Sequence, residues 1–170
     1  MLQCDDAVTL RAPRADDADT LTRNANHRSV WINLRDRMPH PYTRDDAARW
    51  IRSVEDEHPR TSFSIVVDGA VAGGIGLVIG TDIERWAAEV GYWLGPEYWG
   101  RGIATTALRC VCRYAFDDLG LLRIFATPMA WNPASFRVLE KAGFRREGIM
   151  RNACVKDGRL TDMVLYAKTP

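Results

Sequence analysis

The sequence predicts one α/β domain that spans residues 1–170. Segments with alternating apolar residues and segments with helical spacing follow one another in the order β-α-α-β-β-β-α-β-α-β-β. Three of the strands, between residues 62 and 94, are joined by short turns and are expected to form an antiparallel meander. No repeat, low-complexity segment or linker divides the chain, and its length suffices for a sizeable core.

The first part of the chain is predicted to be a strand followed by two helices. Val8–Arg11 alternates as a short strand, and a helix over residues 16–27 follows with an acidic start that suits the helix dipole. Thr43 is a good capping residue for a second helix over residues 44–56. Between the helices, residues 28–42 are rich in arginine and proline, so we expect a loop or short turns.

The meander consists of strands at residues 62–67, 70–79 and 86–94, with Asp68-Gly69 as a strong hairpin turn. The run Gly73–Gly76 has the composition of a phosphate-binding loop. It lies within a strand, however, and no helix follows it. We therefore interpret it as a bulge or a place of close packing.

The remaining elements are a helix, a strand, a helix and a hairpin, at residues 101–118, 122–127, 132–143, and 144–155 with 160–167. In the first of these helices the apolar residues recur with helical spacing, at positions 104, 107, 108, 111 and 115. In the second, Asn132 is the expected cap, proline follows it, and Gly143 ends the helix.

The stretch from Glu89 to Leu108 is the most informative for function. It predicts a strand, a short loop and the opening of an amphipathic helix, with Gly100 and Gly102 where the helix begins. Glycine lets the backbone approach a ligand closely, and the first helical turn carries unpaired N–H groups. Such a helix start is suited to phosphate binding.

Composition narrows the class of protein. A formal charge of +1 argues against a dedicated nucleic-acid binder. No apolar run approaches the roughly 20 residues that span a bilayer, and the first twenty residues are acidic and unlike a signal peptide, so we expect a cytoplasmic protein with no membrane partner. The four cysteines show no disulfide or metal spacing, so we expect reduced thiols; the three histidines are far apart, so we expect no metal site.

The residues Trp99-Gly100-Arg101-Gly102-Ile103-Ala104 resemble the acyl-CoA loop, R/Q-x-x-G-x-G/A, of the GNAT acetyltransferases. Trp99 replaces the usual arginine or glutamine, which is typical of the RimJ/RimL-type branch that acetylates the N-termini of ribosomal proteins. Further similarity to this branch lies, in the same order, at residues 26–31, 41–43 with 47–51, 88–94, 132–135 with 138–144, and 157–159 with Asp162. The resemblance implies a mixed, mostly antiparallel twisted sheet flanked by helices.

The resemblance also implies acetyl-CoA as cosubstrate. The family's paired strands splay apart after a bulged strand, and the pantetheine arm lies in the gap, where backbone N–H groups near Leu94 would stabilise the developing oxyanion. Arg101 could add charge or be a solvated side chain, and Asn132 could contact acetyl-CoA or only cap its helix. The implied binding residues are Tyr92, Trp93, Leu94, Trp99, Gly100, Arg101, Gly102, Ile103, Ala104, Thr105, Asn132 and Ser135.

Two residues are catalytic candidates. By resemblance, Ser135 would protonate the leaving thiolate. Glu89, on the strand that leads into the gap, is the candidate base that takes the proton of the attacking amine. In strict alternation Glu89, Gly91 and Trp93 share one face, but a bulge would change this parity. A structural carboxylate, a water chain, and Glu84 as a reserve base remain alternatives.

The sequence thus favours an N-acetyltransferase that moves acetyl from acetyl-CoA to a primary amine by direct attack, with a protein N-terminus as the expected acceptor. A small-molecule amine acetyltransferase is the alternative. A polycationic acceptor would favour an acidic wall, whereas residues 26–42 carry Arg28, Arg35 and Arg37. An acyl-CoA-binding sensor is a second alternative, although Glu89 and Ser135 together favour an enzyme. The acceptor, the acyl-chain preference and the oligomeric state, a homodimer included, stay open.

Overall fold

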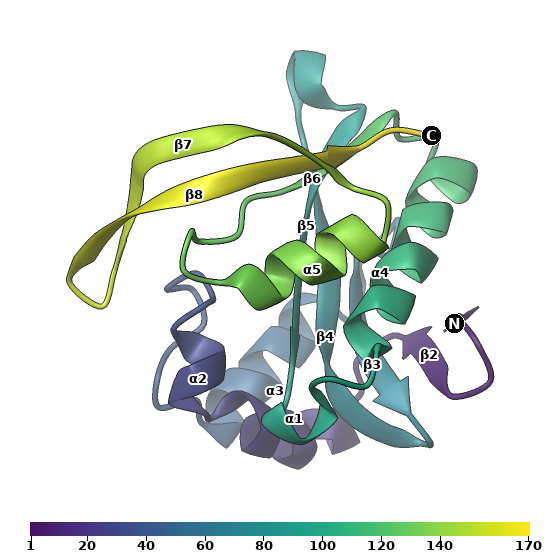
Figure 1. Cartoon of the computed structure of the whole chain (residues 1–170). Coiled ribbons are helices and arrows are strands. Elements are labelled where there is room, and N and C mark those ends of the chain that lie inside the picture. Colours follow the sequence, from purple (N-terminus) through teal and green to yellow (C-terminus); the bar gives the residue numbers. More distant parts are fainter.

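The computed structural model describes all residues, Met1–Pro170. The chain forms one eight-stranded sheet with helices packed against both faces (Figure 1). The strand order is β1-β2-β3-β4-β5-β6-β8-β7, and every neighbouring pair is antiparallel except β5 with β6. The strands are β1 (Leu2–Gln3), β2 (Val8–Arg11), β3 (Ser62–Val67), β4 (Ala70–Ile79), β5 (Ala87–Leu94), β6 (Arg123–Ala126), β7 (Arg145–Lys156) and β8 (Arg159–Lys168). The helices are α1 (Ala18–Ala25), α2 (Arg28–Trp31), α3 (Arg44–Ser53), α4 (Ile103–Arg113) and α5 (Pro133–Lys141).

The predicted α/β class, the antiparallel meander and the order of the major elements are confirmed. Three local features were missed: the two-residue strand β1, the four-residue helix α2 within the expected loop, and a π-helical turn, Tyr114–Asp118, that follows α4. Short elements of this kind carry too few residues for a periodic pattern.

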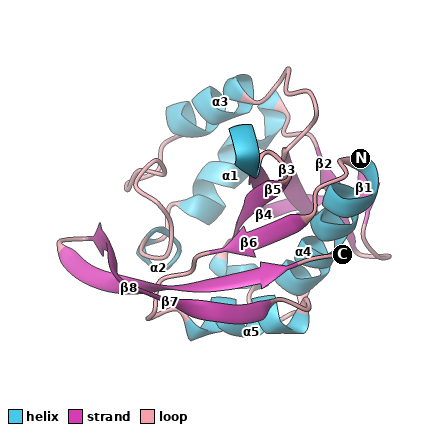
Figure 2. Cartoon of the chain, turned by 90° about the horizontal axis from the view of Figure 1, so that it is seen from above, coloured by secondary structure: helices cyan, strands magenta, loops and turns pink.

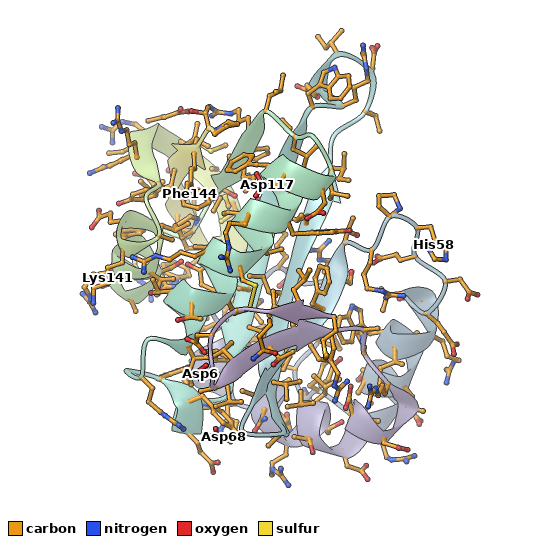
Figure 3. All side chains as sticks on the ribbon, turned by 90° about the vertical axis from the view of Figure 1, so that its right-hand side faces the viewer. Asp6, His58, Asp68, Asp117, Lys141 and Phe144 are labelled. Atoms are coloured by element: carbon orange, nitrogen blue, oxygen red, sulfur yellow. A yellow bond between two sulfur atoms is a disulfide. The ribbon has the colours of Figure 1, made fainter.

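The sheet separates two layers of helices (Figure 2). On one face, α4 packs over the larger core cluster, to which β5 contributes Val90 and Leu94. On the other face, α1 and α3 enclose a smaller cluster, against which Trp93 packs. Figure 3 shows Lys141 and Phe144 on one side of α4 and His58 on the other. The two faces of β5 therefore point into different layers of the molecule.

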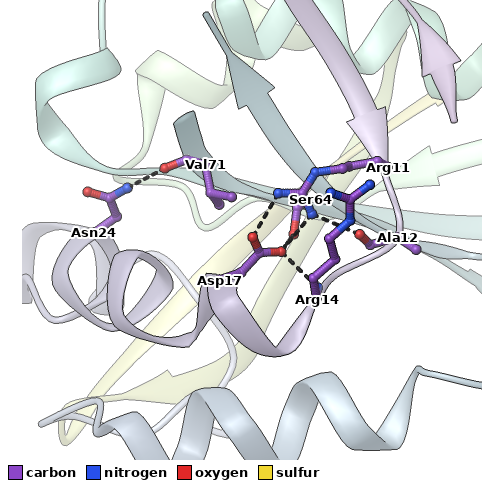
Figure 4. Close-up of polar contacts among 7 residues, drawn as sticks. All are labelled: Arg11, Ala12, Arg14, Asp17, Asn24, Ser64 and Val71. Carbon is purple, nitrogen blue, oxygen red and sulfur yellow. Dashed lines mark hydrogen bonds and ion pairs between the residues drawn. The ribbon is translucent and has the colours of Figure 1, made fainter. Parts of the chain in front are cut away.

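Helix α1 is attached to the sheet by buried polar contacts (Figure 4). Asp17 accepts two hydrogen bonds of 2.7 Å from Arg11 and one of 3.3 Å from Ser64. Burial alone would raise the pKa of Asp17, but the hydrogen bonds and charge of Arg11 outweigh it and lower the pKa. Asn24 donates to the Val71 carbonyl at 2.8 Å, so both ends of α1 are held against the strands.

The glycine run in β4 allows close packing against β5, as expected. A Cβ on Gly73 would lie 2.1 Å from the Trp93 carbonyl oxygen, and one on Gly74 would lie 2.9 Å from the Trp93 indole nitrogen. The register between β3 and β4 also shifts between Ile65 and Val66. These glycines therefore form part of the sheet and permit its close packing.

The expectation of four reduced thiols is wrong for two of them. Cys4 and Cys110 form a disulfide, with Cα atoms 5.2 Å apart, whereas Cys112 and Cys154 are free. The chain before β2, which includes the unpredicted strand β1, brings Cys4 against the core beside α4. No three His, Cys, Asp or Glu side chains converge as a metal site would require. None of the helices has the length and apolar character needed to cross a bilayer.

Candidate active site

A separation of two parallel strands creates the main cleft. β5 and β6 pair only from Ala87 to Glu89, and β5 then continues to Leu94 without this neighbour. A cleft of about 1720 Å³ includes this region and is lined from both sides by helices and loops. Along the other edge, the register of β5 with β4 is continuous from Ala88 to Leu94. The bulge that the resemblance implied before the gap is therefore absent from β5, and Glu89, Gly91 and Trp93 share one face of the strand while Tyr92 lies on the other.

The glycine loop opens α4 at one end of this cleft. Gly100 and Gly102 have φ angles of +75° and +81°, which is the left-handed region that favours glycine. Gly102 is the residue before the helix, and no side chain caps the free N–H groups of the first turn. Trp99 donates its indole N–H to the Leu94 carbonyl at 2.9 Å and so ties the loop to the end of β5.

The loop residues do not all face the cleft. Gly100, Gly102, Ile103, Ala104 and Thr105 line it together with Trp99. Arg101 is exposed, lies over the Tyr98 ring at 5.9 Å and is absent from the lining. The structure therefore brings the backbone donors of the loop to the cleft and leaves the Arg101 side chain at its rim.

The start of α5 contributes a hydroxyl pair. Asn132 caps the helix by accepting a hydrogen bond from the Ser135 backbone N–H at 3.2 Å. The Ser135 Oγ lies 2.7 Å from the Tyr92 hydroxyl, which comes from β5 across the gap. Burial raises the pKa of Tyr92 to about 12, so this hydroxyl stays protonated at neutral pH. The pair can therefore present a proton to a group bound in the gap.

Glu89 belongs to a three-residue polar network on the opposite face of β5. Its carboxylate accepts a 2.7 Å hydrogen bond from the Thr127 hydroxyl and forms an ion pair with Arg35. Arg35 also donates to Thr127 at 3.2 Å. The Glu89 side chain is 25% exposed and lines the cleft, so it is both held in place and accessible.

The reserve candidate, Glu84, does not reach this site. It lies on the exposed turn Asp82–Glu84 between β4 and β5 and does not line the cleft. Glu84 as a reserve base is thus a wrong expectation. Glu84 ends the short helical turn that precedes β5, and the strand begins only at Ala87, so Glu84 and Glu89 lie on different elements.

The tip of the β7–β8 hairpin closes over the other end of the cleft. In Figure 1 the hairpin reaches past α5 toward α2. Lys156, whose side chain is 2% exposed, donates to Asp36 at 2.7 Å and lies 3.8 Å from the centre of the Trp31 ring. Arg28 and Asp157 form a second ion pair between the same segments. These contacts join residues 28–36 to the hairpin and form a wall near Glu89.

Several residues of the site could not be recognised from the sequence, because their partners are distant in the chain. The contacts of Glu89 with Arg35 and Thr127 span 54 and 38 residues of chain, and Lys156 meets Asp36 across 120 residues. Arg137 and Lys141 on α5 also line the cleft and supply positive charge. Only the arginine-rich composition of residues 28–42 gave a signal, and it did not identify the partners.

Comparison with known proteins agrees with this geometry. A family model described as an acetyltransferase (GNAT) domain matches residues 7–145. The uncharacterized N-acetyltransferase p20 of Bacillus licheniformis is 32% identical over 168 residues, which cover 94% of this chain and 91% of p20. The ribosomal protein uS5-alanine N-acetyltransferase of Escherichia coli is 34% identical over 83 residues, which cover 49% of this chain and 43% of that protein.

A solved structure, Mycobacterium smegmatis RimJ in complex with CoA-disulfide, superposes with a TM-score of 0.82 at 28% identity and covers 95% of this chain and 81% of that chain. The chain belongs to the GNAT acetyltransferase family. It is an N-acetyltransferase with acetyl-CoA as its cosubstrate, and the expected RimJ/RimL-like relationship is confirmed.

Proposed function

We propose that the chain, as one acetyltransferase domain of residues 1–170, transfers acetyl from acetyl-CoA to the N-terminal amine of a protein by direct attack. The single observation that carries this proposal is the cleft itself. The cleft contains a carboxylate, Glu89, and a hydroxyl pair, Tyr92 with Ser135, at the gap where β5 leaves β6. The carboxylate lies on one face of the sheet and the hydroxyl pair on the other. A base and an acid that both reach one gap are what amine acylation needs.

Acetyl-CoA fits the elements that meet at this gap. The uncapped first turn of α4, with residues 100–105, offers backbone N–H groups to the pyrophosphate. Arg137 and Lys141 add positive charge from α5. The unpaired edge of β5 from Tyr92 through Trp93 to Leu94 is free to accept the pantetheine arm as an added strand. The side-chain oxygen of Asn132 serves as a helix cap, so its contribution to acetyl-CoA binding would come from its amide nitrogen.

Glu89 accepts the proton of the attacking amine in this proposal. An N-terminal amine, with a pKa of about 8, arrives mostly as ammonium at neutral pH and attacks only when neutral. Thr127 and Arg35 hold the carboxylate in position at the cleft wall. Glu89 and Tyr92 are three residues apart on β5, so their Cα atoms are roughly 10 Å apart along the strand. An amine that attacks a thioester held beside Tyr92 can therefore reach the Glu89 carboxylate through a water molecule.

Ser135 gives its proton to the sulfur of the leaving thiolate and takes a replacement proton from solvent, while the Tyr92 hydroxyl donates a hydrogen bond to the Ser135 oxygen. With a pKa raised to about 12, Tyr92 acts as a donor and not as an anion. Neither of the two free thiols lines the cleft, and burial raises the pKa of Cys112 to about 12, so the cleft offers no thiolate nucleophile. This favours direct transfer over an acyl-enzyme.

A protein N-terminus is favoured as acceptor by the similarity to the uS5-alanine N-acetyltransferase. A small-molecule amine is the second candidate, because the hairpin joined to residues 28–36 covers one end of the cleft. Thiol release from acetyl-CoA, measured with N-terminal peptides and small amines, separates them. Acetylation of a peptide α-amine, located by mass spectrometry, supports the proposal. Release with small amines alone contradicts it, as does binding of acetyl-CoA without any release.

A further inference from the structure

The end of the cleft that contains Glu89 carries an excess of positive charge. Four of the arginines that line the cleft belong to residues 28–37 and to the β7–β8 hairpin, the segments that form the wall near Glu89: Arg28, Arg35, Arg37 and Arg159. Two of them are neutralised by ion pairs, Arg28 with Asp157 and Arg35 with Glu89. Arg37 is exposed and forms no ion pair. Arg159 forms none either and lies over the Trp131 ring at 5.4 Å. Two uncompensated cations therefore remain.

The two unpaired arginines lie at the same place in the fold. Arg37 directly follows Asp36, whose carboxylate holds Lys156. Arg159 is the cross-strand partner of Lys156 in the β7–β8 hairpin. Both arginines therefore flank the contact that joins residues 28–36 to the hairpin tip. Lys156 and Asp36 neutralise each other, so this ion pair neither adds to the positive charge of the two arginines nor reduces it.

These arginines are not needed at the phosphate end of the cleft. The loop of residues 100–105 follows the Leu94 end of β5, whereas Glu89 lies five residues, or roughly 17 Å, along the strand. The cleft wall formed by α5 has its own cations, Arg137 and Lys141. The cations near Glu89 are therefore available to a second substrate.

We propose that the acceptor is a peptide N-terminus with acidic side chains directly after its first residue. This inference rests on the proposed function, because it names the acceptor class of the same site. The α-amine of such a peptide contacts the Glu89 carboxylate, which is already paired with Arg35, while the unpaired Arg37 and Arg159 attract the following carboxylates. A basic peptide gains the first contact and loses the second through repulsion.

The test is calorimetric binding of matched peptides to the protein loaded with coenzyme A. The peptides begin Ala-Glu-Glu, Ala-Gln-Gln and Ala-Lys-Lys and are otherwise identical. Two exposed ion pairs predict that the acidic peptide binds about tenfold more tightly than the neutral one. The difference should shrink as salt is added. In the double variant Arg37→Gln/Arg159→Gln the acidic and neutral peptides should bind equally.

Arg52→Gln is the matched control, because Arg52 is an exposed arginine of α3 outside the cleft. It should keep the full preference. Equal binding of acidic and neutral peptides by the unmodified protein, or a preference that survives in the double variant, would overturn the inference. Thiol release with the same peptides separates the two proposals: release from all peptides without a charge preference contradicts the charge inference alone, and the absence of any release contradicts the proposed function.

Discussion

The contact between Tyr92 and Ser135 makes a quantitative prediction. Replacing Tyr92 by phenylalanine removes the hydroxyl that lies 2.7 Å from the Ser135 Oγ and leaves the ring in place. If Tyr92 holds the serine hydroxyl toward the sulfur of the thioester, the variant should turn over more slowly. Its affinity for acetyl-CoA should be nearly unchanged, because the ring packs against the core as before.

The magnitude follows from the chemistry of the pair. One hydrogen bond contributes about 0.5–1.5 kcal/mol, so Tyr92→Phe should lower kcat by about two- to twelvefold. Ser135→Ala should lower kcat by about tenfold, near the lower end for acid catalysis, because the thiolate of coenzyme A is a good leaving group. Since Tyr92 acts through Ser135, the double variant should be no slower than Ser135→Ala alone.

The assay is thiol release under saturating acetyl-CoA, with kcat and KM determined separately for the three variants. A double variant whose loss equals the product of the two single losses would show that the hydroxyls act independently. That result, or a Tyr92→Phe enzyme with the kcat of the unmodified protein, would refute the coupling.

Three further predictions concern binding and stability. Gly102→Val places a β-branched residue at a φ of +81° and should weaken acetyl-CoA binding in calorimetry with a nearly unchanged circular-dichroism spectrum; unchanged affinity in a folded variant would contradict the placement. Asp36→Asn should lower the free energy of unfolding more than Lys156→Met in urea titrations, because it leaves a buried ammonium without its carboxylate, whereas methionine still packs on Trp31; the reverse order would refute this. Burial raises the pKa values of Tyr92 and Cys112 to about 12. Their contribution to the free energy of unfolding is therefore fully present below the pKa values of the unfolded chain and is lost as pH rises to about 12. A free energy of unfolding that stays flat from about pH 9 to 12 would contradict these shifts.

Local patterns in the sequence predicted the parts of the fold that depend on near neighbours. Thr43 caps α3 and forms a reciprocal capping box with Asp46, and Asn132 caps α5 as expected. Gly102 begins α4 in a left-handed conformation that few other residues adopt. The strict alternation that puts Glu89 on the face opposite Tyr92 also held, because the β4–β5 register is continuous.

Contacts between distant segments could not be predicted in the same way. The disulfide joins Cys4 to Cys110 across 106 residues, and no spacing rule signals such a pair. Arg35 belonged to a segment expected as loop, and its ion pair with Glu89 depends on how that segment folds over β5. The resemblance to the GNAT family pointed to the Glu89 and Ser135 positions, but only the tertiary structure shows which groups hold them.

The most direct test of the proposed chemistry is the pH dependence of Glu89→Gln. Glutamine keeps the size and hydrogen-bonding capacity of Glu89 but cannot take a proton from the amine, so kcat/KM for a peptide acceptor should fall by about 10²-fold at neutral pH. As pH rises past about 8, the amine is increasingly neutral by itself, and the rate of the variant should approach that of the unmodified enzyme. The control Glu84→Gln, on the exposed turn outside the cleft, should match the unmodified enzyme at every pH. A Glu89→Gln rate that stays the same fraction of the unmodified rate from neutral to alkaline pH would contradict a base at Glu89.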